Sequence, residues 1–157
     1  MKTTGSGFVR SPEVTYRIMS AVKSKDTRPE LILRKSLWSK GLRYRVNVKS
    51  LPGKPDIVFS RAKIAVFCDG DFWHGNNWAI RGMRSLDDEL ERYSQFWKEK
   101  ILGNIERDIA NTSKLRADGW EVIRIWESDI KADVEKCVSV ISKAYNDAIE
   151  SINEVLS

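Results

Sequence analysis

The segment formed by residues 51–75 constrains the fold more than any other part of the chain. It contains two apolar runs, residues 57–59 and 64–67, which are separated by a short polar turn around Arg61. Two such runs joined by a few residues are typical of an antiparallel β-hairpin. We therefore expect a sheet built around this hairpin.

The hairpin also predicts where its carboxylates lie. If the turn is centred on Arg61 and Ala62, Asp56 lies opposite Phe67, on the same face and at the same end as Asp69. Such diagonal neighbours are about 7 to 8 Å apart. Two converging carboxylates can bind Mg²⁺, which takes oxygen ligands and substrate phosphates. The only histidine, His74, follows closely and is the available imidazole base.

This pattern favours a metal-dependent nuclease, although each residue also has a structural explanation. An Asp after a proline often only forms a turn, and Asp69-Gly70 is an ordinary turn pair. A single histidine is commonly a core or surface residue. The joint arrangement of these residues, rather than any one of them, indicates phosphodiester chemistry.

Composition limits the remaining possibilities. The 157 residues suit one domain, expected over residues 11–157 after a disordered lead of residues 1–10. A net charge of +5 suits a polyanionic partner. Two cysteines are too few for a disulfide framework, and we expect neither a membrane-spanning run nor a signal peptide. A monomeric, soluble, cytoplasmic protein with no membrane partner is expected.

Apolar periodicity predicts the other elements. Thr27 and Glu30 form a capping box at the start of one helix, and residues 76–89 are expected to be a mobile loop near the substrate. The expected helices cover residues 11–22, 27–40, 90–117 and 130–155, and the expected strands residues 43–48, 57–59, 64–67 and 120–126. This order predicts an α/β (α+β) fold with a mixed central sheet flanked by helices.

Several segments, in order, resemble the Vsr family of very short patch repair endonucleases, within the PD-(D/E)xK nuclease superfamily. The resemblance implies a restriction-endonuclease-like core and nicking beside T:G mismatches. The matching segments are residues 19–30, 51–56 (LPGKPD), 72–75 (FWHG), 96–101, 104–108 (NIERD) and 119–127.

The resemblance implies roles for five residues around the catalytic centre. Asp56 would bind Mg²⁺, and the carbonyl of Cys68 would reach the same metal. His74 matches the catalytic base. Glu30 and Asp108 match acids that hold hydrated metal or orient the imidazole. Two alternatives stay open, because the capping box already explains Glu30 and an acid on a helix such as Asp108 is by default a solvated surface residue.

The resemblance also implies DNA contacts for Met19, Phe72, Trp73, Trp97 and Lys100. The aromatic residues would wedge into the base stack beside the mismatch, with Met19 and Lys100 approaching from the other groove. Wedging costs a few kcal/mol per base step, and a mispair lowers that cost. The alternative is that Phe72 and Trp73 pack under their own loop.

The chain departs from the family at two places. Relatives bind a structural zinc, whereas the matching positions here are Asp71, Asn76, Trp78 and Ser128, so we expect no zinc site. Asp69 stands where the family often has histidine and could add a second carboxylate ligand to the metal. Both departures bear on T:G specificity, because something other than zinc must hold the loop.

Three hypotheses follow. The first is a Mg²⁺-dependent endonuclease that nicks one strand at T:G mismatches arising from deaminated 5-methylcytosine. The second is a restriction, homing or structure-specific nuclease of the same superfamily, and the third a non-cleaving DNA-binding module. The partner is double-stranded DNA in each case, and mismatch-repair proteins and a cytosine methyltransferase are expected by family analogy.

Overall fold

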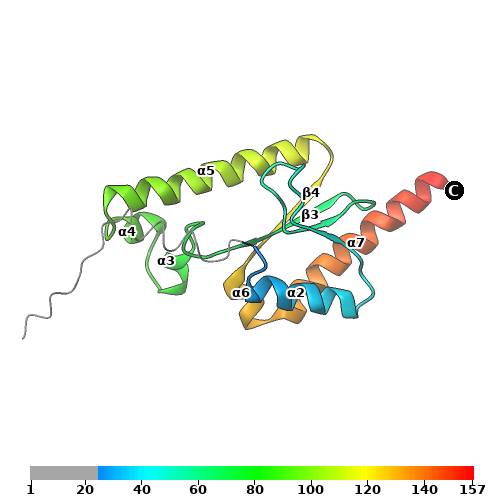
Figure 1. Ribbon diagram of the computed structural model, residues 1–157, viewed down its shortest axis with the longest axis horizontal. Helices are drawn as coiled ribbons and strands as arrows, with labels where there is room; N and C mark the ends of the chain where they lie inside the picture. The colour runs from blue at the N-terminus through cyan, green and yellow to red at the C-terminus, as the bar shows by residue number, and fades with distance from the viewer. Residues whose placement is uncertain (1–24) are drawn as a thin grey trace, which may run out of the picture.

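The computed structural model describes residues 25–157 and contains a four-stranded mixed sheet with strand order β1-β2-β3-β4. β1 pairs with β2 and β2 with β3 in antiparallel orientation, and β4 runs parallel to β3. The predicted mixed sheet flanked by helices is confirmed (Figure 1). The strands are β1 (Arg45–Val46), β2 (Ile57–Phe59), β3 (Ile64–Asp69) and β4 (Glu121–Trp126).

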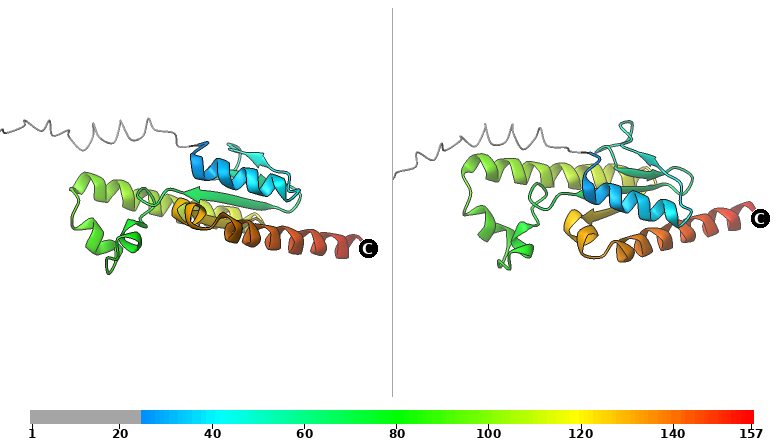
Figure 2. Two further views of the ribbon diagram at one scale, coloured as in Figure 1. Left: turned by 90° about the horizontal axis from the view of Figure 1, so that it is seen from below. Right: turned by 60° about the horizontal axis from the view of Figure 1, so that its bottom comes forward.

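Helices cover both faces of the sheet. In Figure 1, α5 runs along one face, and α2, α6 and α7 lie on the other; Figure 2 shows α3 and α4 beside the first turns of α5, away from the sheet. No helix within residues 25–157 combines the length and apolarity needed to cross a membrane. The helices are α2 (Arg28–Ser39), α3 (Asn77–Ile80), α4 (Leu86–Leu90), α5 (Gln95–Ala117), α6 (Glu127–Ala132) and α7 (Val134–Leu156).

The hairpin has the predicted register. Ile57 pairs with Val66, and the backbone N–H of Asp56 donates to the carbonyl of Val66 at 3.0 Å. Asp56 therefore lies opposite Phe67, as the sequence predicts. The parallel register of β3 with β4 then places Arg124 next to Phe67.

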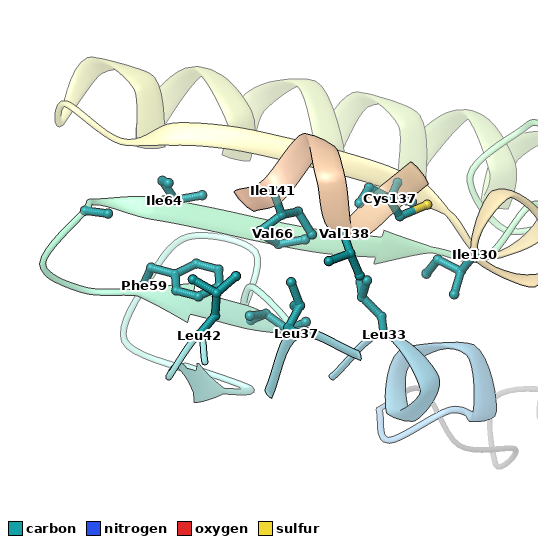
Figure 3. Packing of buried hydrophobic residues seen from close by; sticks show 13 residues of the cluster. Leu33, Leu37, Leu42, Phe59, Ile64, Val66, Ile130, Cys137, Val138 and Ile141 are labelled. Atoms are coloured by element: carbon teal, nitrogen blue, oxygen red, sulfur yellow. The ribbon is translucent and has the colours of Figure 1, made fainter. Parts of the chain in front are cut away.

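The larger core lies between the sheet and the layer of α2, α6 and α7. Alternate side chains of β2 and β3 point into it, as period-two geometry requires, and Figure 3 shows these side chains meeting leucines of α2 and residues of α7. The buried members of this core are Leu33, Leu37, Leu42, Ile57, Phe59, Ala62, Ile64, Val66, Ile125, Ile130, Cys137, Val138 and Ile141.

The predicted ends of two helices are confirmed. The hydroxyl of Thr27 accepts from the N–H of Glu30 at 3.4 Å, and the Glu30 carboxylate accepts from the N–H of Thr27 at 3.2 Å. At the end of α5, Gly119 adopts a φ of +86° that favours glycine. The lead of residues 1–10, the helix of residues 11–22 and Met19 lie outside the described residues.

Four expected elements are wrong in extent. The strand of residues 43–48 shrinks to β1, because Asn47 turns the chain with a φ of +49°. The expected loop contains α3 and α4, and the hydroxyl of Ser85 caps α4. The long helix begins at Gln95 rather than at residue 90. The C-terminal helix is two helices, because Asp133 leaves helical geometry and caps α7.

Candidate active site

A cleft of about 460 Å³ opens on the side of the sheet that faces α5. Five predicted site residues line it together, and four basic side chains, from Lys25, Lys49, Lys54 and Arg124, also contribute. Acids and bases thus share one cavity whose size suits a phosphate group with its metal and waters. The five residues are Asp56, Cys68, Asp69, His74 and Asp108.

Asp56 stands immediately before β2. Its carboxylate accepts a hydrogen bond of 2.7 Å from the backbone N–H of Cys68 on β3. Burial raises the pKa of Asp56 to about 8; the Cys68 hydrogen bond opposes this shift, and the nearby charges of Glu30 and Asp69 add to it. A cation bound at this carboxylate would offset the unfavourable burial of its charge.

Asp69 ends β3 and is nearly fully buried, with 6% of its surface exposed. Both of its carboxylate oxygens accept from Nη1 of Arg124, at 3.0 and 3.1 Å. Burial raises the pKa of Asp69, although the positive charges of His74 and Arg124 oppose this shift. The side chain that the sequence marks as a metal ligand is therefore already an ion-pair partner.

His74 contacts Asp108 through its Nδ1 atom. Burial acts to lower the pKa of His74, but the hydrogen bond to Asp108 and the charges of Asp69 and Asp108 outweigh it and raise the pKa. Glycine is favoured directly after the histidine, because φ at Gly75 is +80° and a Cβ there would lie 2.7 Å from the Ile105 side chain on α5. With Nδ1 engaged by a carboxylate, Nε2 is the nitrogen that can serve a substrate.

Three of these side chains also come close enough to share an ion. One ligand atom from each of Asp69, His74 and Asp108 lies within 4.8 Å of the others. Asp56 is not part of this group. Of the three residues predicted to bind one metal, Asp56 and Cys68 contact each other, whereas Asp69 groups with His74 and Asp108.

Glu30 does not line the cleft. It is 1% exposed and accepts from Nη2 of Arg34 at 3.0 Å in addition to its capping bond with Thr27. Its charge nevertheless contributes to the raised pKa of Asp56. Glu30 thus has the structural role that the capping box predicts and also lies near the metal-binding carboxylate.

The predicted DNA-contacting aromatics gather beside the cleft. Phe72 and Trp73 lie in the loop after β3, and Trp97 lies in the first turn of α5. The ring centroids of Phe72 and Trp97 are 5.5 Å apart, and those of Trp73 and Trp97 are 5.8 Å apart. All three side chains are half-buried. Lys100 follows one turn later on α5, with its Nζ 5.5 Å from the Phe96 ring.

Hydrogen bonds join three of the four positions that the resemblance matched to a family zinc site. The carboxylate of Asp71 accepts from the backbone N–H of Ser128 at 3.0 Å, from its hydroxyl at 2.6 Å, and from the side-chain amide of Asn76 at 2.8 Å. This cluster ties the loop that carries Phe72, Trp73 and His74 to the first turn of α6. The prediction that no zinc binds here stays a prediction.

Sequence reasoning missed Arg124. Four contacts hold its guanidinium, which also lies 4.0 Å from the centre of the Phe67 ring. One signal was available, because Arg124 interrupts an otherwise apolar run, Val122-Ile123-Arg124-Ile125, in a predicted strand. A charge in the middle of a strand needs a partner, but the sequence did not show which acid supplies it.

A hairpin-based mixed sheet with clustered Asp and His side chains, in a cleft that lysines also line, is consistent with a DNA endonuclease. Comparison with known proteins supports this class. Residues 9–80 match the family model described as DNA mismatch endonuclease Vsr. The chain is 42% identical to the type II nicking enzyme V.NmeDIP of Neisseria meningitidis serogroup C, over 87% of this chain and 89% of that relative.

Other relatives agree. The chain is 42% identical to the type II nicking enzyme V.HpaIIP of Haemophilus parainfluenzae, over 85% of this chain and 92% of that relative. It is 35% identical to the DNA mismatch endonuclease Vsr of Escherichia coli (strain K12), over 72% of this chain and 69% of that relative. The chain belongs to the Vsr family and is a DNA endonuclease. The hypothesis of a non-cleaving binding module is therefore wrong.

Proposed function

We propose that this endonuclease uses Mg²⁺ to nick one strand of duplex DNA at a T:G mismatch, such as one produced by deamination of 5-methylcytosine. The observation that carries the proposal is one cleft that holds both a half-buried carboxylate, Asp56, and a histidine paired with an acid, His74 and Asp108. One relative is described as a type II nicking enzyme and another as a DNA mismatch endonuclease.

The residues around Asp56 fit Mg²⁺. The carboxylate of Asp56 and the carbonyl of Cys68 are hard oxygen donors, and a half-buried carboxylate with a pKa raised to about 8 is stabilised by a cation. These two residues would hold the ion, which when bound polarises the scissile phosphate and offsets developing negative charge. That Asp69 binds this ion stays a prediction.

His74 would act as the general base. Its Nε2 atom would accept a proton from the attacking water, and the positive charge formed on the ring would be stabilised by Asp108 at Nδ1. Asp108 is therefore a positioning residue that fixes the tautomer and the orientation of the imidazole. The basic rim of Lys25, Lys49 and Lys54 would bind the flanking phosphates.

Phe72, Trp73 and Trp97 would enter the base stack beside the mismatch, with Lys100 and Met19 contacting the DNA nearby. Their half-buried cluster at the start of α5 keeps large aromatic surfaces ordered next to the cleft. A rigid wedge loses little side-chain entropy on binding, and it distinguishes a mismatch because unstacking costs less there. Mismatch-repair proteins and a cytosine methyltransferase are proposed as cellular partners by analogy.

The test is cleavage of a labelled duplex with one T:G pair, beside its T:A control, with Mg²⁺ and with EDTA. We expect metal-dependent nicking of the T:G duplex alone, and its loss in Asp56→Ala. A matched control is Asp147→Asn, because Asp147 is an exposed acid on α7 that pairs with the exposed Lys143 at 3.0 Å; this variant should cleave like the wild type.

Equal cutting of matched and mismatched duplexes would contradict the mismatch proposal. That result would favour the second hypothesis, a restriction or homing nuclease. Two relatives are described as type II nicking enzymes, a description that does not mention a mismatch. Cleavage in EDTA would contradict the metal requirement, and full activity of Asp56→Ala would contradict the assignment of its ligand.

A further inference from the structure

Arg124 is the most fully engaged side chain of the cleft. Its Nη1 donates to both oxygens of Asp69, its Nε donates to the hydroxyl of Thr112 at 2.9 Å, and its Nη2 donates to the carbonyl of Asp108 at 3.4 Å. The guanidinium lies over the Phe67 ring. These contacts fix the guanidinium in one orientation between β3 and α5.

This orientation decides what the cluster of Asp69, His74 and Asp108 can bind. Ligand atoms of the three lie within 4.8 Å of one another, which would suit a metal ion. However, Nη1 of Arg124 is 3.0 Å from Oδ1 of Asp69 and 3.6 Å from Oδ1 of Asp108. The guanidinium is positively charged at every accessible pH. The guanidinium therefore stands where a metal ion would bind, and its charge repels such an ion.

We propose that Arg124 is a positioning residue that fills the Asp69, His74 and Asp108 cluster with a fixed positive charge, excludes metal from it and leaves His74 free as a base. Asp69 then binds Arg124 rather than Mg²⁺, and the metal is confined to the Asp56 side of the cleft. Arg124 also holds the backbone of Asp108, the residue that orients the imidazole. This inference rests on the proposed function for the role of His74.

Metal counting tests this proposal independently of cleavage. Mn²⁺ bound per chain is measured by electron paramagnetic resonance for the wild type, Arg124→Gln, Asp69→Asn and the double variant. We expect one additional Mn²⁺ in Arg124→Gln, because the cluster loses its fixed positive charge and Asp69 loses its ion pair. The additional ion should be absent from the double variant, and Asp69→Asn alone should bind as many ions as the wild type.

Kinetics supply the second readout. In Arg124→Lys the charge remains, but one ammonium cannot reproduce the separate contacts of Nε, Nη1 and Nη2 with Thr112, Asp69 and Asp108. We expect this variant to bind the wild-type number of Mn²⁺ ions, to lose about tenfold or more in kcat and to keep KM for the T:G duplex within about threefold. Thr112→Val, which removes only the acceptor of Nε, is the matched control and should change kcat by less than Arg124→Lys does.

Two results would overturn the proposal. One is an unchanged Mn²⁺ count in folded Arg124→Gln, and the other is loss of an ion in Asp69→Asn, which would make Asp69 a metal ligand. If Arg124→Gln does not fold, full kcat in Arg124→Lys would overturn the positioning role. Failure of the wild type to nick the T:G duplex would instead contradict the proposed function, and the Mn²⁺ counts would still decide the role of Arg124.

Discussion

The two faces of the sheet differ in chemistry although the same strands form both. The face covered by α2, α6 and α7 is a continuous apolar core (Figure 3). The face toward α5 has a small apolar cluster around Phe67 and Leu115, and it carries Asp56, Asp69 and Arg124 at one end. One face therefore supplies most of the packing, so that the other can hold buried charges that destabilise the fold.

Replacing the base should produce the largest effect on the polar face. We expect His74→Ala to lower the nicking rate by about 10²- to 10⁴-fold, because general base catalysis contributes that much. Its free energy of unfolding should fall by only about 1 to 2 kcal/mol, less than for a core truncation, because the variant loses the contact of the imidazole with Asp108. Single-turnover cleavage and urea denaturation measure the two quantities. A large loss of stability would mean that the two faces are not separate in role.

Truncation of a core side chain on the apolar face should lower the stability of the fold rather than the nicking rate. Phe59 is 2% exposed and packs against Tyr145, with ring centroids 5.4 Å apart. We expect Phe59→Ala to lower the free energy of unfolding by about 3 to 5 kcal/mol through lost transfer energy and a cavity. Denaturation with urea measures this loss. The folded fraction should nick at the wild-type rate, and a slower rate per folded molecule would show that the core face also tunes the site.

The pH dependence of stability sharpens the contrast. The pKa of Asp56 is raised to about 8 in the folded chain by burial, whereas in the unfolded chain it is near 3.9. The protonated carboxyl thus stabilises the metal-free fold below about pH 4, and this stabilisation is lost as the pH rises toward 8.

Asn mimics the protonated carboxyl at every pH, so metal-free Asp56→Asn should become more stable than the wild type as the pH increases. We expect a gain of about 1 to 2 kcal/mol at pH 8, measured by thermal unfolding in EDTA. Saturating Mg²⁺ should reduce the difference in stability, because only the wild type has the Asp56 carboxylate that binds the ion. A difference that does not change with pH would show that Asp56 titrates normally in the folded chain.

The smallest effect is expected at the loop that extends from the polar face. Asp71→Ala removes three accepted hydrogen bonds and should lower the global stability by about 1 kcal/mol, because the loop contributes little to the core. Hydrogen exchange should increase at residues 70–76 and not in β2. Asn76→Ala removes only one of the three bonds and is the milder matched variant. Unchanged exchange in Asp71→Ala would mean that other contacts hold the loop.

Much of the fold could be predicted because its signals are local. The apolar runs and their short turn predict the hairpin register, which places Asp56 opposite Phe67 and on the face of Asp69. The capping box at Thr27 and the end of α5 at Gly119 follow from residues within one turn of each other. The helices α3 and α4 were missed, because five residues or fewer show no helical period.

The sequence by itself determined which side chains share a face of the hairpin, because period two and the turn fix this within a few residues. Only the tertiary structure decided what each charge meets. Arg124 is separated from Asp69 by 55 residues and Asp108 from His74 by 34, and α5 must cross the sheet before β4 joins β3 in parallel register. That long connection carries no local signal, so the pairing that engages Asp69 depends on how the layers pack.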